Sequence, residues 1–236
     1  MTNRAVANRY EIDLTPDMVG DVAFDYDAQV GITSVAGEIT AWADQSGNAN
    51  NLVKGTTGPM YSAGSGVYGR VGALSLGGTE FMSSATVVQV PRASEAKTIF
   101  VVMRSTNGSD LQAPMKVTDA GFGWATCISS GNSLRFYCQN AFSEDLGAMT
   151  ANTSYVATID HDGGSAVHGW LNGVGGTAKT VAVPIDRVPT GINVMAFGQG
   201  SLPMFGAVSR VVVFREILSA SNRLRFENYL RARYGV

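Results

Sequence analysis

The two histidines of the chain, His161 and His168, are its first candidates for acid–base chemistry. The sequence has no G-x-S-x-G motif, which would present a serine nucleophile on a sharp strand-to-helix turn. His161 stands in the Asp- and Gly-rich residues 160–164, a composition that is typical of a turn. We therefore expect His161 to be a solvated turn residue rather than a catalytic base.

Two Asp-x-Asp pairs could supply oxygen ligands for Ca²⁺, namely Asp160 with Asp162 and Asp25 with Asp27. A bound Ca²⁺ takes about six to eight oxygen ligands, so two carboxylates alone do not complete a site. The same spacing is also common in turns and strands. A calcium site and a purely local role therefore both stay open, and we expect no other cofactor.

Trp170 and His168 share one face of an expected strand, opposite Leu171, because residues two apart in a strand point the same way. An aromatic platform of this kind can stack on a sugar ring, so the two residues are candidates for glycan binding. The alternative is that they pack under a neighbouring loop or subunit.

Cys127 and Cys138 flank an expected hairpin. They would face each other only if Asn132-Ser133 formed a two-residue turn. A turn centred on Gly131 would put them out of register. Buried thiols and a disulfide both stay open, and the lack of any signal for an oxidising compartment favours thiols.

The composition excludes several classes of protein. The 236 residues carry a net charge of −2, and 15% of them are charged, against about 25% in an average protein. With a net charge near zero, the chain as a whole lacks the excess of positive charge that is typical of nucleic-acid-binding proteins. No apolar run approaches the roughly 18–20 residues of a membrane span, and residues 1–10 lack the apolar segment of a secretory signal. We expect a soluble protein without a signal peptide or membrane insertion.

Opposite charges concentrate at the two ends of the chain. Residues 1–51 contain two arginines and eight acidic side chains, a net −6, whereas residues 204–236 contain six arginines and two glutamates, a net +4. Either the two ends lie together in the fold and compensate, or the C-terminal end forms a basic docking surface.

Alternating apolar residues predict many short strands. Residues 22–27 alternate between an apolar and an acidic face, and residues 98–103 are apolar on both faces, which indicates a covered central strand. Asn172-Gly173 predicts a type I′ turn, because both central positions need φ > 0. Residues 64–69 match G-x-G-x-x-G, but strand-like residues follow them, so we expect a surface loop. Strands at this density predict an all-β, two-sheet antiparallel sandwich.

One long helix is expected, over residues 219–234. Ser219 or Ser221 can cap its N-terminus, and Gly235 can end it. Its apolar stripe would consist of Leu224, Phe226, Tyr229 and Leu230.

The most specific stretch is residues 41–52, A-W-A-D-Q-S-G-N-A-N-N-L. It resembles the W-x-D-Q-S-G-N-x-N-N/D signature of laminin-G-like, concanavalin A-like jelly-roll domains. Further stretches resemble other elements of that family, at residues 22–28, 59–61, 74–78, 170–173 and 205–235. The resemblance implies one jelly-roll domain at residues 19–236 with a C-terminal helix, after an N-terminal arm at residues 1–18.

We expect a structural role for the loop in this signature. Asp44 and Ser46 can bond the loop backbone, and Gly47 supplies φ > 0. The residues assigned to this structural loop are Trp42, Asp44, Gln45, Ser46, Gly47 and Asn48. Trp42 is expected to be a core or loop-anchoring residue.

A glycosidase site is not expected. Glu11-Ile12-Asp13 resembles the start of the E-x-D-x-x-E strand of jelly-roll glucanases, but no second glutamate follows and Pro16 interrupts the strand. A retaining mechanism needs a pair of carboxylates. We therefore predict no hydrolase activity.

The family resemblance also implies a function. Such domains are binding and structural modules far more often than enzymes, and they occur in long secreted bacterial proteins and in phage virions. A single short domain that starts at Met1 and lacks an export signal is similar to a phage structural protein. We predict a non-enzymatic virion component on a head or tail surface, made in the host cytoplasm. Its partners would be other copies of itself and other virion proteins. The alternative is a free-standing carbohydrate-binding lectin for surface glycans.

The polar residues 1–17 suggest a route to assembly. Tyr10, Ile12 and Leu14 alternate, and an arm of this kind could add as a strand to the sheet edge of a neighbouring subunit. The alternatives are a frayed terminus and a strand that pairs within its own sandwich.

Overall fold

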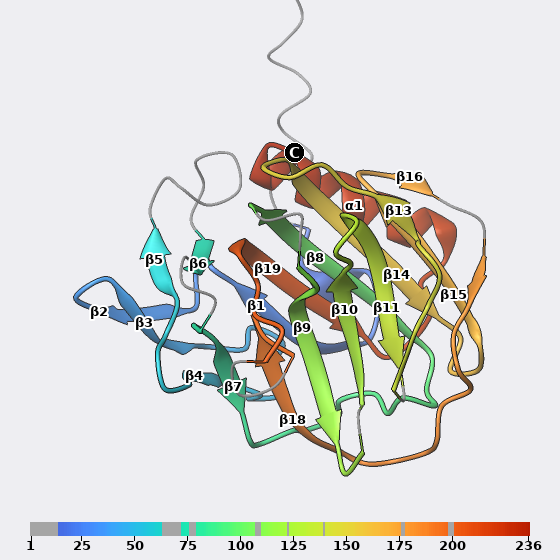
Figure 1. Cartoon of the computed structure of the whole chain (residues 1–236), viewed down its shortest axis with the longest axis horizontal. Coiled ribbons are helices and arrows are strands. Elements are labelled where there is room, and N and C mark those ends of the chain that lie inside the picture. The colour runs from blue at the N-terminus through green and yellow to red at the C-terminus, as the bar shows by residue number, and fades with distance from the viewer. Residues whose placement is uncertain are drawn as a thin grey trace, which may run out of the picture.

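The computed structural model describes residues 14–62, 72–75, 79–106, 110–121, 123–138, 140–175, 178–197 and 201–236. These residues form an all-β sandwich of two layers with one α-helix on its outside (Figure 1). The predicted fold class is therefore confirmed. Glu11, Asp13 and the glycine-rich residues 64–69 lie outside the described residues.

Antiparallel pairing orders the strands of each layer. The first layer contains, across the sheet, β2 (Ile32–Val35), β3 (Glu38–Trp42), β4 (Leu52–Lys54), β7 (Met82–Ser84), β18 (Pro189–Val194), β9 (Gln112–Asp119), β10 (Trp124–Ile128), β11 (Ser133–Cys138) and the short β12 (Ala141–Phe142) and β13 (Gly147–Ala148). The second contains β1 (Val22–Asp27) and β6 (Gly72–Ser75), both beside β19 (Gly206–Phe214), then β8 (Lys97–Ser105), β14 (Ser154–His161), β15 (Ala166–Leu171) and the short β16 (Val174–Gly175) and β17 (Lys179–Thr180). β5 (Met60–Ser62) pairs with β3 and β6 and so joins the layers.

Two apolar cores stabilise the sandwich and its helix. The larger core lies between the layers, and the smaller one lies between the second layer and helix α1 (Ala220–Tyr234). Strand β8 contributes to both, because Ile99 and Val101 belong to the first core while Phe100 and Val102 belong to the second. The covered central strand predicted at residues 98–103 is thus confirmed.

Helix α1 has the predicted ends. The Ser219 hydroxyl accepts a hydrogen bond of 3.2 Å from the backbone N–H of Asn222, and Gly235 ends the helix with φ of +69°. Asn172 and Gly173, which join β15 to β16, have φ of +52° and +81°, as a type I′ turn requires.

The buried face of α1 differs from the predicted stripe at one position. Phe226, Leu230 and Tyr234 are fully buried, and the Phe226 ring lies 4.9 Å from that of Phe100. Leu224 is 46% exposed, so the prediction that it belongs to the apolar stripe was wrong. The buried row advances by four residues, and a residue two positions before Phe226 points away from it.

The charged ends of the chain meet in the fold, so the compensating interpretation is confirmed. The Arg210 guanidinium donates to both carboxylate oxygens of Asp25, at 2.9 and 2.8 Å. Arg233 Nη2 donates to Asp27 Oδ2 at 2.8 Å. Asp25 and Asp27, one of the two candidate calcium pairs, thus direct their oxygens at arginines on β19 and α1.

The two cysteines are buried and free, so the disulfide alternative was wrong. Cys127 pairs across the strands with Arg135, and Cys138 pairs with Trp124. Cys138 belongs to the core between the layers, whereas Cys127 lies in a small cluster apart from it. Burial raises the pKa of the Cys138 thiol to about 11, which keeps it protonated at neutral pH.

The described part of the predicted arm lies against the domain. Leu14 belongs to the core beneath α1, and a 3₁₀ helix, Pro16–Met18, leads into β1. Directly after the arm, the carbonyl of Val19 accepts a 2.9 Å hydrogen bond from the side chain of Asn222. Among the described residues, no helix has the length and apolar character needed to cross a membrane.

Candidate functional site

His168 and Trp170, the candidate glycan platform, lie side by side on β15 with ring centroids 5.8 Å apart. The guanidinium carbon of Arg223 on α1 lies 3.9 Å from the Trp170 ring centroid. Gly175 of β16 lies so close to the indole that an added Cβ would overlap it. A sugar that stacked on this face of Trp170 would therefore compete with Arg223.

Asp160 and Asp162, the second candidate calcium pair, have separate roles. Asp160 is buried on β14 and accepts a 2.7 Å hydrogen bond from the Thr98 hydroxyl. Asp162 lies in the following turn, where its Oδ1 accepts the backbone N–H groups of Gly164 at 2.7 Å and Ala166 at 3.1 Å. Within the described ranges, no group of three or more His, Cys, Asp or Glu side chains could hold a metal ion.

His161 is fully buried, so the prediction of a solvated turn residue was wrong. Strand β14 continues through residue 161, and the turn begins two residues later than the composition suggested. The imidazole lies 4.8 Å from the ring of Phe136, and its Nδ1 lies 3.2 Å from Lys97 Nζ. A partner 64 residues away thus satisfies one nitrogen of this histidine.

The Asp44 carboxylate organises the loop after β3. Its Oδ1 accepts the backbone N–H groups of Asp25 and Ser46, both at 2.9 Å. Its Oδ2 accepts the Ser46 hydroxyl at 2.9 Å and the backbone N–H of Asn50 at 3.0 Å. Gly47 has φ of +86°, a conformation that favours glycine. These bonds fold the loop onto the start of β1.

Two further side chains of the loop bond backbone carbonyls. Gln45 Nε2 donates to the carbonyl of Ala43 at 3.0 Å. Asn48 Nδ2 donates to the carbonyls of Val22 and Ala23, both at 3.0 Å. Both contacts are internal to the protein.

Asn50 links this loop to a second segment. It is fully buried, its Oδ1 accepts the backbone N–H of Val88 at 2.6 Å, and its Nδ2 donates to the Val88 carbonyl at 3.0 Å. The backbone of Val88 is therefore fixed, and its neighbours Val87 and Gln89 line a pocket.

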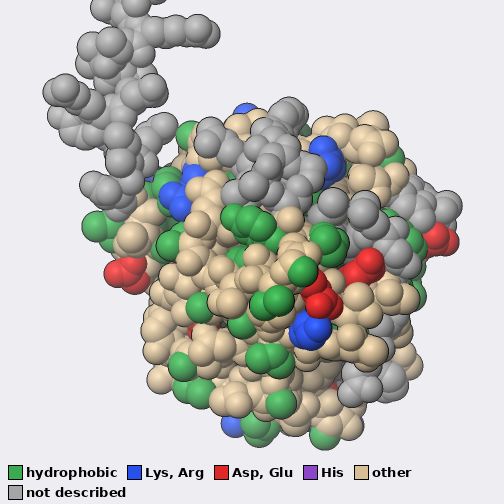
Figure 2. All heavy atoms as spheres, turned by 90° about the vertical axis from the view of Figure 1, so that its left-hand side faces the viewer, with side chains coloured by type: hydrophobic (Ala, Val, Ile, Leu, Met, Phe, Trp, Pro, Cys, Tyr) green, Lys and Arg blue, Asp and Glu red, His purple; other side chains and the backbone are tan. Residues whose placement is uncertain are grey.

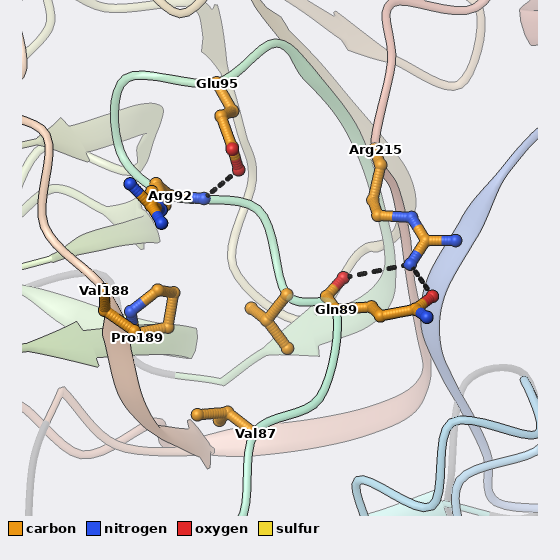
Figure 3. Close-up of a pocket in the computed structure, with 8 residues that line it drawn as sticks. Val87, Gln89, Arg92, Glu95, Val188, Pro189 and Arg215 are labelled. Atoms are coloured by element: carbon orange, nitrogen blue, oxygen red, sulfur yellow. Dashed lines mark hydrogen bonds between the residues drawn. The ribbon is translucent and has the colours of Figure 1, made fainter.

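This loop pocket is a cavity of about 360 Å³ (Figure 3). Its eight lining residues are Val87, Gln89, Val90, Arg92, Glu95, Val188, Pro189 and Arg215. They come from the connection between β7 and β8, the start of β18 with the residue before it, and the residue after β19. The volume falls in the range of roughly 300–1,000 Å³ that is typical of small-ligand pockets.

The polar groups on one side of the loop pocket are held by Arg215. Its Nε donates to Asp21 Oδ2 at 2.7 Å, and its Nη1 bonds both the side-chain and the backbone oxygen of Gln89 (Figure 3). The hydrogen bond from Arg215 lowers the pKa of Asp21, so the two groups form an ion pair at neutral pH. Gln89 is thereby fixed at the rim.

The opposite side is held by Asp186. Arg92 Nη1 donates to Asp186 Oδ2 and the Ser94 hydroxyl donates to Oδ1, both at 2.9 Å. The backbone N–H of Arg92 donates to the Glu95 carboxylate at 2.7 Å (Figure 3). The connection before β8 is thus joined to the segment before β18.

The chemistry of the loop pocket suits binding better than hydrolysis. Valine and proline side chains offer an apolar surface, and the Gln89 amide and Glu95 carboxylate can bond hydroxyl groups. Glu95 is the one carboxylate among the eight lining residues, whereas glycoside hydrolysis uses two. Sequence reasoning missed this pocket because its residues come from three separate segments and form no motif.

A second surface is formed by β2 to β5. Figure 2 shows this side of the molecule, where hydrophobic side chains outnumber charged ones. Val35 is 63% exposed and Val53 is 56% exposed, and β2 contains no charged residue. Edge strands without charges are open to pairing with another chain. The expected contact with other copies stays a prediction.

Comparison with known proteins identifies the fold. No protein-family model and no curated protein matches the sequence. Among solved structures, a GH54 α-L-arabinofuranosidase has a TM-score of 0.61 at 14% identity, over 93% of this chain and 60% of that chain. The binding domain of Paraclostridial Mosquitocidal Protein 1 has a TM-score of 0.61 at 16% identity, over 89% of this chain and 52% of that one. The chain thus spans just over half the length of these two structures.

A third structure matches along nearly its whole length. It is domain 4 of AbnA, a GH43 extracellular arabinanase from Geobacillus stearothermophilus, in complex with arabinotriose. Its TM-score is 0.57 at 12% identity, over 86% of this chain and 97% of that chain. Together these structures show that the chain has a β-sandwich fold.

Proposed function

We propose that this chain is a non-catalytic, lectin-like module that binds a small glycan in the loop pocket. The observation that carries the proposal is the pocket itself, which pairs an apolar wall with the fixed polar groups of Gln89, Glu95 and Arg92. Sugars present both C–H faces and hydroxyl groups, so they match such a lining. A sugar-bound domain of the same fold gives further support.

Filling the pocket tests the proposal. Val188 is 62% exposed and lines the loop pocket, so Val188→Trp should occupy the cavity without disturbing the core. We expect glycan affinity to fall by at least about tenfold, equivalent to 1.4 kcal/mol. The measurement is a glycan array that includes arabinotriose, followed by calorimetric titration.

Two variants accompany this test. Val183 is 71% exposed on the same segment but does not line the pocket, so Val183→Trp should bind as the wild type does. Trp170→Ala tests the platform suggested by the sequence. A glycan that binds Val188→Trp normally but not Trp170→Ala would place the site on β15 and contradict the loop pocket.

The more specific role that the sequence suggested, a phage virion protein of the laminin-G-like type, stays a prediction. The sparse lysines, four in the whole chain, fit surfaces that are covered by other subunits, because lysine is depleted at interfaces. Mass spectrometry of purified phage particles tests this role directly. Finding the chain at many copies per particle would support it, and its absence from particles would leave the lectin role alone.

A further inference from the structure

Lys97, the first residue of β8, is a lysine with no exposed surface. Its Nζ lies 3.1 Å from the carbonyl oxygen of Ala93, bonds the carbonyl of Glu95, and lies 3.2 Å from His161 Nδ1. A protonated lysine has three N–H donors, and here each one meets an acceptor.

His161 can serve as the third acceptor because its Nδ1 carries no proton. The same Nδ1 accepts the backbone N–H of Gly163 at 3.2 Å, which places the ring proton on Nε2. Burial lowers the pKa of His161 to about 4, and the nearby charge of Lys97 acts in the same direction. The imidazole is therefore neutral at pH 7.

The two carbonyls belong to one wall of the loop pocket. Arg92 and Glu95 line the pocket, and Ala93 lies between them in the chain. The same connection is held by Trp124, whose Nε1 donates to the carbonyl of Pro91 at 2.9 Å. A buried carbonyl that loses its donor is unfavourable, so an apolar side chain at position 97 would free this wall to move toward water.

From this geometry we propose that Lys97 is a positioning residue, whose buried ammonium holds residues 92–95 in the form that binds the ligand. The inference rests on the proposed function, because it assumes that a glycan enters the loop pocket. Lys97 itself does not line the pocket and acts through the two carbonyls.

The strength of the hydrogen bonds from Lys97 to the carbonyls of Ala93 and Glu95 should depend on pH. Burial lowers the pKa of Lys97 to about 7, against the opposing charges of Glu95 and Asp162, while the neighbouring Cys138 thiol and His161 imidazole are both neutral. As the pH rises through 7, the side chain loses its charge and one N–H. Charge-assisted hydrogen bonds are stronger than neutral ones, so glycan affinity should fall as the pH rises.

The experiment compares Lys97→Met with Lys116→Met. Lys116 is a matched control because it is also a buried lysine, with its Nζ 3.6 Å from the ring centroid of Phe197, and it does not line the pocket. Amide hydrogen exchange reports on residues 92–96. Titration with the glycan identified on the array, with arabinotriose as the first ligand tried, gives the affinity at pH 6 and pH 8.

In Lys97→Met we expect exchange at residues 92–96 to be about tenfold faster or more, while β14 and β19 keep their protection. The affinity of the wild type and of Lys116→Met should fall between pH 6 and pH 8, and that of Lys97→Met should be low at both. If Lys97→Met does not fold, Lys97→Gln keeps two N–H donors on its side-chain amide and should show a smaller change in the same direction.

Unchanged exchange at residues 92–96 in a folded Lys97 variant overturns the proposal. If the wild type binds no glycan, the proposed function fails, and the exchange rates alone decide the role of Lys97. If the wild type binds a glycan and Lys97→Met binds it equally at both pH values, the proposed function stands and the role of Lys97 is refuted.

Discussion

Replacing Arg210 by methionine is expected to lower the free energy of unfolding by about 3–5 kcal/mol at pH 7. Arg210 is 4% exposed and faces two carboxylates that are also buried, Asp25 and Asp27. Without the guanidinium, both acids would lie in the interior with less compensation, and an uncompensated buried charge is costly. Urea unfolding followed by tryptophan fluorescence measures the loss.

The pH dependence of this variant has a definite sign. Burial raises the pKa of Asp25, and the Arg210 charge is the main opposing influence. Removing Arg210 should raise that pKa further above its unfolded value. A group with a raised folded pKa stabilises the fold as it takes up a proton, so the deficit of Arg210→Met should shrink as the pH falls from 7 toward 4.

Lys54→Met is the control for the buried ion pair. Lys54 and Glu38 form a surface pair at 2.8 Å with side chains 39% and 30% exposed, so its loss should cost no more than about 1 kcal/mol. If Arg210→Met and Lys54→Met have the same small effect, the Arg210 cluster does not contribute as we infer.

Local patterns were sufficient to predict much of the fold. The alternation in residues 24–27 separated the core face of β1 from the acidic face that meets Arg210, whereas Val22 lies in the core beneath α1 because the strand pairing shifts between Val22 and Phe24. The doubly apolar residues 98–103 indicated a strand between two cores. Ser219 and Gly235 marked the ends of α1, because capping depends on residues within a few positions of the helix end.

Features that depend on distant residues were not predictable in this way. The sequence predicted a turn at His161 because its neighbours in the chain are turn formers. In the fold, the side chain that contacts the buried imidazole is Lys97, 64 positions earlier. The loop pocket joins Gln89 to Arg215 across 126 positions. Neither pairing leaves a signal in one sequence, so the candidate site emerged only from the fold.

Trp42→Ala is expected to cost about 3–5 kcal/mol, the range for large aromatic residues truncated in a core. Trp42 is fully buried at the end of β3, pairs across the sheet with Leu52, and its ring lies 6.0 Å from that of Tyr26. Protein interiors are close-packed, so the side chains around Trp42 would fill only part of the cavity that the substitution leaves. A fall in melting temperature, measured by circular dichroism, checks the prediction.

The position of Trp42 also predicts how its loss should affect binding. Two residues later Asp44 bonds the backbone of Asn50, and Asn50 fixes Val88 beside the loop pocket. Trp42→Ala should therefore weaken glycan binding only together with stability. The half-buried Trp170 provides the comparison, since Trp170→Ala should lower the melting temperature less. A Trp42→Ala protein with unchanged stability and lost glycan binding would instead make Trp42 a ligand contact, which its burial argues against.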